Sequence, residues 1–277
     1  MRFRRNAGLD TSQIGDRRGM GAPMVAGGGL IGLVFLVVSL LTGGGGQDGI
    51  QLGGGGGGEP ASDLSAECRT GDDANQRDDC RIVGVVNSVQ RYWQDNLDGY
   101  RKARTVFFDG GTQTGCGNAT SAVGPFYCPL DQTIYIDLAF YGDLRTRFGA
   151  KGGPFAEAYV IAHEYGHHVE NLLGVLSRAK RGDTGADSDS VKVELMADCL
   201  AGMWARGAVD TGYIEEITDA DIRDGLDAAA AIGDDRIQSQ VQGRVDPESW
   251  THGSAEQRQR WFTTGFRSGR LEECRTL

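Results

Sequence analysis

The stretch VIAHEYGHHVEN (Val160–Asn171) holds three of the four histidines in the chain, grouped around one glutamate. Apolar residues recur at helical spacing over residues 155–173, which predicts a helix. On a helix, His163 and His167 lie four residues apart on one face, where both can bind the same metal ion. Glu164 follows the first histidine, the position of the general base that takes a proton from water at the metal. The stretch therefore predicts half of a zinc site.

A catalytic zinc site needs three protein ligands, so a further residue must come from elsewhere in the chain. His168 lies about 100° around the helix from its neighbour and is excluded, as a solvated or supporting histidine. The segment SVKVELMADCLAGMWA, within a helix predicted from Ser190 to Arg206, offers Glu194 and Asp198 four residues apart. Carboxylates in such apolar surroundings are costly to bury unless paired or metal-bound. We predict Glu194 as the third ligand and Asp198 as a hydrogen-bond acceptor for a ligating imidazole.

The N-terminal part of the chain predicts a membrane anchor followed by a tether. Residues 20–42 carry no charge and include LIGLVFLVVSLL, long enough for a bilayer, which needs about twenty residues. Arginines precede this stretch, so residues 1–19 are expected as a basic cytoplasmic tail, with the domain outside. A cleaved signal peptide or a buried core helix are the alternatives. The glycine-rich residues 43–61 predict a flexible linker, and residues 62–277 a folded extracytoplasmic domain.

Within that domain, the pattern predicts a few strands early and helices thereafter. Asp79–Asn96 has the apolar spacing of an amphipathic helix. Arg104–Asp109 and the start of TIYIDLAF have the β-branched and aromatic composition of strands. A last helix is expected to begin at Ser254, which forms a capping-box pattern with Gln257. The fold class is therefore α+β, mostly helical with a small early β-sheet and preceded by one transmembrane helix.

The net charge and the cysteine content indicate which partners and which compartment are expected. The formal net charge of −10 and the pI near 4.9 argue against nucleic acid as a partner. Six cysteines are suited to three disulfides in an oxidising compartment. We favour the pairs Cys68–Cys80, Cys116–Cys128 and Cys199–Cys274, although the sequence leaves other pairings open. A thiolate metal site is disfavoured because the chain contains no Cys-x-x-Cys.

Two of these motifs, HEYGHHVE followed by ELMADCLAG, resemble the gluzincins, the thermolysin-like HExxH…ExxxD peptidases. With GNATSAVGPFYCPLDQTIYID and THGSAEQRQRWFTTGF, they resemble the bacterial "putative neutral zinc metallopeptidase" family, whose members typically have an N-terminal membrane segment. The resemblance implies a zincin-like domain with one catalytic Zn²⁺. It implies zinc ligation by His163, His167 and Glu194. It also implies Glu164 as the catalytic base and Asp198 as the residue that orients a ligand.

Two further roles have candidate residues, and the same resemblance suggests the first of them. Thermolysin-like enzymes use a histidine late in the sequence to stabilise the oxyanion of the tetrahedral intermediate, and His252 is the candidate. The alternative for His252 is a helix N-terminal residue that bonds backbone. Asn118 and Ala119, before the second strand, are candidates for an edge to which an extended peptide adds by main-chain hydrogen bonds. An ordinary loop is the alternative there.

The sequence thus predicts a membrane-anchored zinc metallopeptidase, an endopeptidase acting on peptide or protein substrates, with no nucleic-acid partner. One alternative is a catalytically silent domain that is stabilised by zinc and binds a partner. The other is a zinc hydrolase of a non-peptide substrate. Glu164 favours catalysis over the silent domain, because a structural zinc site needs no base.

Overall fold

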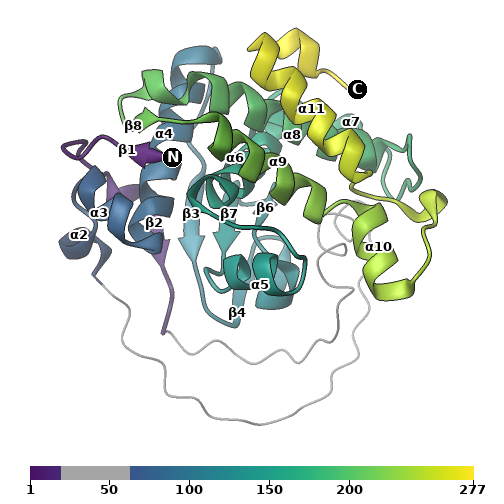
Figure 1. Cartoon of the computed structure of the whole chain (residues 1–277), viewed down its shortest axis with the longest axis horizontal. Coiled ribbons are helices and arrows are strands. Elements are labelled where there is room, and N and C mark those ends of the chain that lie inside the picture. Colours follow the sequence, from purple (N-terminus) through teal and green to yellow (C-terminus); the bar gives the residue numbers. More distant parts are fainter. Residues whose placement is uncertain (20–62) are drawn as a thin grey trace.

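The computed structural model describes residues 1–19 and 63–277 (Figure 1). The predicted anchor (20–42), the whole predicted linker (43–61) and the first residue of the predicted domain, Ser62, lie outside these residues. The described part is mostly helical with some sheet, which confirms the α+β class. None of its helices combines the length and the apolar character that crossing a bilayer requires.

The main sheet has four strands in the order β2-β3-β7-β6. Strands β2 (Ile14–Asp16), β3 (Arg104–Phe107) and β7 (Thr133–Ile136) run parallel, whereas β6 (Phe126–Cys128) is antiparallel to β7. Strands β3 and β7 confirm the two predicted strands. Strand β6 forms one edge of the sheet, and the segment that leads into it borders the candidate site.

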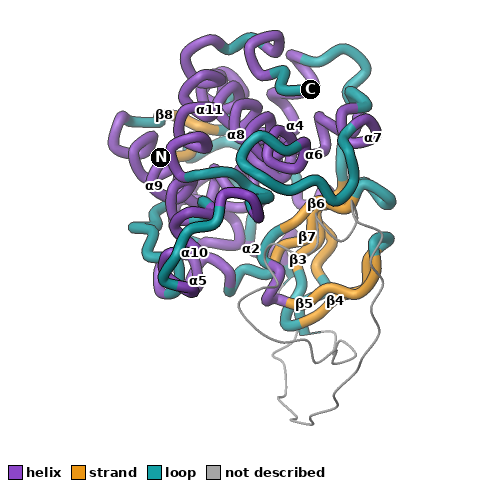
Figure 2. Tube along the Cα trace, turned by 90° about the vertical axis from the view of Figure 1, so that its right-hand side faces the viewer, coloured by secondary structure: helices purple, strands orange, loops and turns teal. Residues whose placement is uncertain are grey.

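A separate two-stranded hairpin, of β4 (Gly111–Thr114) and β5 (Gly117–Thr120), precedes β6. The sequence of this hairpin is rich in turn residues and does not predict strands. In Figure 2 the hairpin and the main sheet lie together at the lower right, whereas β8 (Ile214–Glu216) lies among the helices. A small apolar cluster that includes Ala119 joins the hairpin to residues of β3, β6 and β7.

Helix α6 (Pro154–Leu172) is the centre of the helical part. It packs against α4 (Asp78–Asn96), α8 (Asp189–Gly207) and α9 (Asp219–Ala231). Pro154 occupies its first turn, where the missing N–H costs nothing. Side chains from Phe155 to Glu170 are buried on every face, as is typical of a helix surrounded by others. Any polar group on α6 must therefore find its partner inside the protein.

The predicted helices agree with the structure apart from details at their ends. Helix α8 begins at Asp189, one residue before the predicted start, and is capped by Ser188, whose side chain accepts from the Val191 N–H. The predicted capping box of Ser254 and Gln257 is present at the start of the last helix. The remaining helices and strands are α2 (Leu64–Glu67), α3 (Gly71–Gln76), α5 (Phe140–Thr146), α7 (Val175–Arg178), α10 (Asp234–Gln242), α11 (Ala255–Ser268), β1 (Arg2–Phe3) and β8 (Ile214–Glu216).

All three favoured cysteine pairs are disulfides in the structure. Two of them close short loops of twelve residues' separation. The third joins Cys199 on α8 to Cys274 after α11, and so ties the end of the chain to the helix that carries Glu194.

Residues 1–19 differ from the predicted separate tail, because they pack into the domain. Strand β1 pairs with β8, and β2 adds to the edge of the main sheet beside β3. The Phe3 side chain is 1% exposed. A single membrane crossing between residues 19 and 63 would place these two parts on opposite sides. The predicted cytoplasmic N-terminus with an external domain therefore conflicts with this packing.

Replacing Phe3 by alanine should lower the free energy of unfolding by about 3–5 kcal/mol, the usual cost of emptying a buried phenylalanine site. Urea denaturation of the full chain would measure this. Arg2→Ala is the matched control, since the Arg2 side chain is 59% exposed and should change stability by less than about 0.5 kcal/mol. Equal stability of Phe3→Ala and the parent protein would show that this segment does not pack as described.

Candidate metal centre

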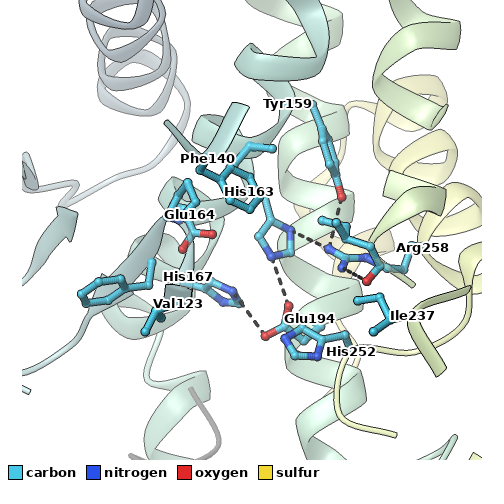
Figure 3. A pocket seen from close by; sticks show the side chains of 14 residues that line it. Val123, Phe140, Tyr159, His163, Glu164, His167, Glu194, Ile237, His252 and Arg258 are labelled. Carbon is cyan, nitrogen blue, oxygen red and sulfur yellow. Dashed lines mark hydrogen bonds and ion pairs between the residues drawn. The ribbon is translucent and has the colours of Figure 1, made fainter. Parts of the chain in front are cut away.

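Two helices bring the three predicted ligands together. His163 and His167 project from α6, and Glu194 projects from α8 (Figure 3). The Nε2 atom of His163 lies 3.1 Å from Glu194 Oε2, and Nε2 of His167 lies 3.6 Å from Glu194 Oε1. One ligand atom from each residue lies within 4.8 Å of the others, and all three residues are buried. The structure thus places the predicted ligands around one point.

The close approach of α6 and α8 depends on Gly166, between the two histidines. A Cβ atom at Gly166 would lie 2.9 Å from the backbone of Ala197, closer than real Cβ contacts. A side chain here would push α8 away and carry Glu194 and Asp198 with it. The glycine of HEYGHH is therefore part of what forms the site.

Each histidine has a carboxylate partner for its second ring nitrogen. His163 Nδ1 lies 2.9 Å from Asp198 Oδ1, as the sequence predicted. His167 Nδ1 lies 2.8 Å from Oε2 of Glu170, which the sequence analysis missed. The spacing of His167 and Glu170, one helical turn, was a signal that could have found it. These contacts fix each imidazole with its Nε2 directed at the common point.

The donor set fits zinc. Two imidazoles and a carboxylate form the ligand set of many catalytic zinc sites. In a tetrahedral site with bonds of about 2.0–2.1 Å, ligand atoms lie about 3.3 Å apart. The 3.1 Å between His163 Nε2 and Glu194 Oε2 is close to this separation. Among the described residues, four buried carboxyl groups meet at this centre, those of Glu164, Glu170, Glu194 and Asp198. A divalent cation would offset part of the negative charge that these groups bring together.

The electrostatics of the histidines agree with such a cation-binding cluster. Burial disfavours a charged imidazole, yet the carboxylates of Asp198 and Glu194 outweigh it and raise the pKa of His163 to about 10. For His167 burial prevails, and its pKa is lowered. The cluster therefore attracts positive charge, whether a proton on His163 or a metal ion.

Glu164 and His252 line the same pocket as the ligands. Glu164 is 7% exposed, and burial raises the pKa of its carboxyl above the usual value. Figure 3 shows Glu164 on one side of the three ligands and His252 beside Glu194. Burial disfavours a charged His252, but the carboxylates of Glu194 and Asp234 raise its pKa. The two predicted catalytic residues therefore flank the metal centre.

His252 is held by Asp234, at the start of α10, which the sequence did not single out. Oδ2 of Asp234 accepts hydrogen bonds from the backbone N–H groups of Thr251, His252 and Gly253, at 2.7, 2.6 and 3.0 Å. Its Oδ1 lies 3.5 Å from His252 Nδ1. The structure thus places His252 in a loop just before α11, where it lines the pocket.

Three other residues that the sequence analysis considered, His168, Asn118 and Ala119, lie outside the group of ligands. His168 is fully buried, not solvated, and its ring contacts the Tyr127 hydroxyl at 3.0 Å and the Arg101 carbonyl at 2.6 Å. Asn118 and Ala119 lie in the β4–β5 hairpin. Neither is among the residues that line the pocket. On that side the pocket wall is formed by Val123, Pro125 and Phe126, at the edge strand β6.

The comparisons with known proteins identify the family of the chain. The model of the family described as "Putative neutral zinc metallopeptidase" matches residues 1–277. The chain belongs to this family. An uncharacterized protein of Mycobacterium tuberculosis (strain ATCC 25618 / H37Rv) is 55% identical over 225 residues, covering 79% of this chain and 76% of its own. The uncharacterized protein YpfJ of Escherichia coli (strain K12) is 38% identical over 285 residues, covering 97% and 96%. No solved structure gives a significant match.

Proposed function

We propose that the protein is a zinc-dependent peptidase that cleaves internal peptide bonds. The observation that carries this proposal is the position of Glu164, a buried carboxyl in the same pocket as the ligands but outside the ligand set. A zinc site that serves only stability is closed by four protein ligands and needs no base. Here three ligands face a pocket together with an acid–base residue and a histidine.

The residues of the pocket divide the chemistry among them. Zinc, when bound, supplies Lewis acidity that polarises a carbonyl and lowers the pKa of water. The Glu164 carboxylate accepts a proton from the attacking water and returns it to the leaving amine. His252 donates a hydrogen bond to the carbonyl oxygen as negative charge develops on it. Apolar side chains such as Val160 and Ile237 line the pocket and exclude bulk water.

A peptide library tests the proposal directly. The full chain, loaded with zinc, is incubated with mixed peptides and a denatured protein, and new termini are identified by mass spectrometry. We expect cleavage at internal bonds that is absent with Glu164→Gln. Release of terminal residues alone would replace endopeptidase by exopeptidase. Zinc binding without any peptide cleavage would contradict the proposal and favour either a silent binding domain or a hydrolase of another substrate class.

Replacing His252 by alanine should lower kcat by about 100- to 1,000-fold, the usual cost of losing one oxyanion donor. KM should change little, because this contact strengthens only in the transition state. Steady-state kinetics on a peptide substrate would measure both. Asp234→Asn should give a smaller loss in kcat, since it loosens the loop but keeps the imidazole. An unchanged kcat for His252→Ala would remove His252 from the mechanism.

We further propose that the domain lies outside the cytoplasm, attached to a membrane through residues 20–42. The uncharged stretch supports the attachment, and three disulfides support an oxidising compartment. Because residues 1–19 pack on the domain, this proposal departs from the predicted cytoplasmic N-terminus and places them on the domain's side. Protease added to intact cells should reach tags at both ends of the chain. Protection of the C-terminal tag in cells whose cytosolic controls stay intact would contradict it.

A further inference from the structure

Arg258, on α11, is a buried cation next to the metal centre. Its side chain is 1% exposed, and the site proposed above does not use it as a ligand, base or oxyanion donor. A buried guanidinium is costly unless its donors are satisfied. It meets the Asp198 carboxylate with two donors, Nε at 2.9 Å from Oδ2 and Nη2 at 3.1 Å from Oδ1. Further contacts reach the Tyr159 hydroxyl at 3.2 Å and the Ile232 carbonyl at 3.3 Å. Nη2 also lies 3.5 Å from His163 Nδ1, farther than the 2.9 Å that separates this nitrogen from Asp198 Oδ1.

The same carboxylate orients a metal ligand. Oδ1 of Asp198 lies 2.9 Å from His163 Nδ1 and also accepts from the Tyr159 hydroxyl. The planar fork of an arginine fixes the plane of the carboxylate that it binds, which a single point charge does not. Arg258, Asp198 and His163 thus form a chain of contacts that ends at His163 Nδ1, the ring nitrogen that is not the ligand atom. Figure 3 shows the two ends of this chain, Arg258 and His163, beside each other.

The packing of α11 on α8 sets the position of this fork. A Cβ atom at Gly265 would lie 1.8 Å from the carbonyl oxygen of Cys199, so the two helices touch through backbone at the residue after Asp198. The disulfide from Cys199 to Cys274 ties the chain beyond α11 to the same point of α8. Arg258 lies about two turns before Gly265, on the same face of α11.

The support of the second histidine is different. Glu170, which contacts His167, lies on the same helix as its histidine. Its other oxygen, Oε1, is buried without a hydrogen-bond partner among the described residues. Within residues 1–19 and 63–277, therefore, a cation from another helix clamps only the His163 side of the centre. A change at Arg258 should act on the orientation of His163 and leave that of His167 in place.

We propose that Arg258 is a positioning residue of the metal centre: its two-pronged contact fixes Asp198, and through Asp198 the His163 imidazole. The proposal deepens the proposed function, because it rests on the same metal site. It assigns to the last helix a part in metal affinity, although that helix supplies no ligand.

The test is the zinc affinity of Arg258→Lys in the full chain, measured by competition with a chromogenic chelator. Lysine keeps the charge but loses the fork, so we expect affinity to fall by about 10- to 100-fold, as for other residues that orient a ligand. The visible absorption spectrum of the Co²⁺-loaded protein should change as well, because His163 is reoriented. Arg260→Lys, an exposed arginine on the same helix, is the matched control and should change neither. Wild-type affinity and spectrum in a folded Arg258→Lys variant would overturn the proposal.

A second pair of variants serves if Arg258→Lys does not fold. In an Asp198→Asn background, Arg258→Gln removes the remaining charge, so the pair buries no unpaired ion. Because Arg258 acts through Asp198, the added change should weaken zinc binding no further. A further loss of more than about tenfold would overturn the proposal, since the effects of independent sites add. Zinc affinity and the Co²⁺ spectrum are measured without hydrolysis. A protein that binds zinc but cleaves no peptide would therefore contradict the proposed function and leave the role of Arg258 untouched.

Discussion

Replacing Glu194 by alanine should weaken zinc binding by more than about 100-fold, because changing a residue that only orients a ligand already costs about 10- to 100-fold. The carboxylate is one of three ligands, and the two histidines alone leave the ion with solvent for its remaining positions. Metal analysis after dialysis against a weak chelator would measure the loss.

The control for this variant is Glu256→Ala, an exposed glutamate in the first turn of α11. It should keep the zinc content of the parent protein. Circular dichroism of both variants separates loss of metal from loss of fold. A Glu194→Ala protein that retains tightly bound zinc would show that the ion is held elsewhere.

Replacing Glu164 by glutamine should lower kcat by about 100- to 10,000-fold, the range that a general acid–base residue contributes. The amide has nearly the shape of the carboxyl but cannot take the proton from water. Zinc content should stay at the level of the parent protein, because Glu164 is outside the ligand set. Hydrolysis of a peptide substrate and metal analysis of the same sample measure both.

The pairing of these two results identifies the roles. Loss of zinc in Glu194→Ala with loss of activity alone in Glu164→Gln separates a ligand from a base. If Glu164→Gln loses zinc as well, the carboxylate is holding the ion. If it keeps full activity, proton transfer is carried out by another group.

The metal centre could be predicted because its residues come in two pairs, each of them close together in the sequence. His163 and His167 share a face of one helix, and Glu194 and Asp198 share a face of another, so spacing alone orients each pair. Apolar residues surround both pairs, so both helix faces must be buried. Two buried faces that carry polar groups satisfy each other when they meet. The sequence also indicated the main helices and the strands β3 and β7, whose patterns extend over enough residues to be read.

The parts of the structure that the sequence did not predict depend on contacts between residues that are far apart in the sequence. Strands β1 and β2 have two and three residues, too few for a pattern, and they exist only through pairing with β8 and β3. Arg258 and Asp234 acquire their roles where α11 and α10 meet α8 and the loop of His252. A charged residue on an amphipathic helix is ordinarily assigned to solvent, so the burial of Arg258 could not be inferred from its helix alone.

The most direct test of the central claim is anomalous diffraction at the zinc absorption edge from crystals of the zinc-loaded full chain. We predict one strong peak between Nε2 of His163, Nε2 of His167 and the Glu194 carboxylate, with Glu164 outside bonding distance. A peak at another position, or no peak in a folded protein supplied with zinc, would contradict the account.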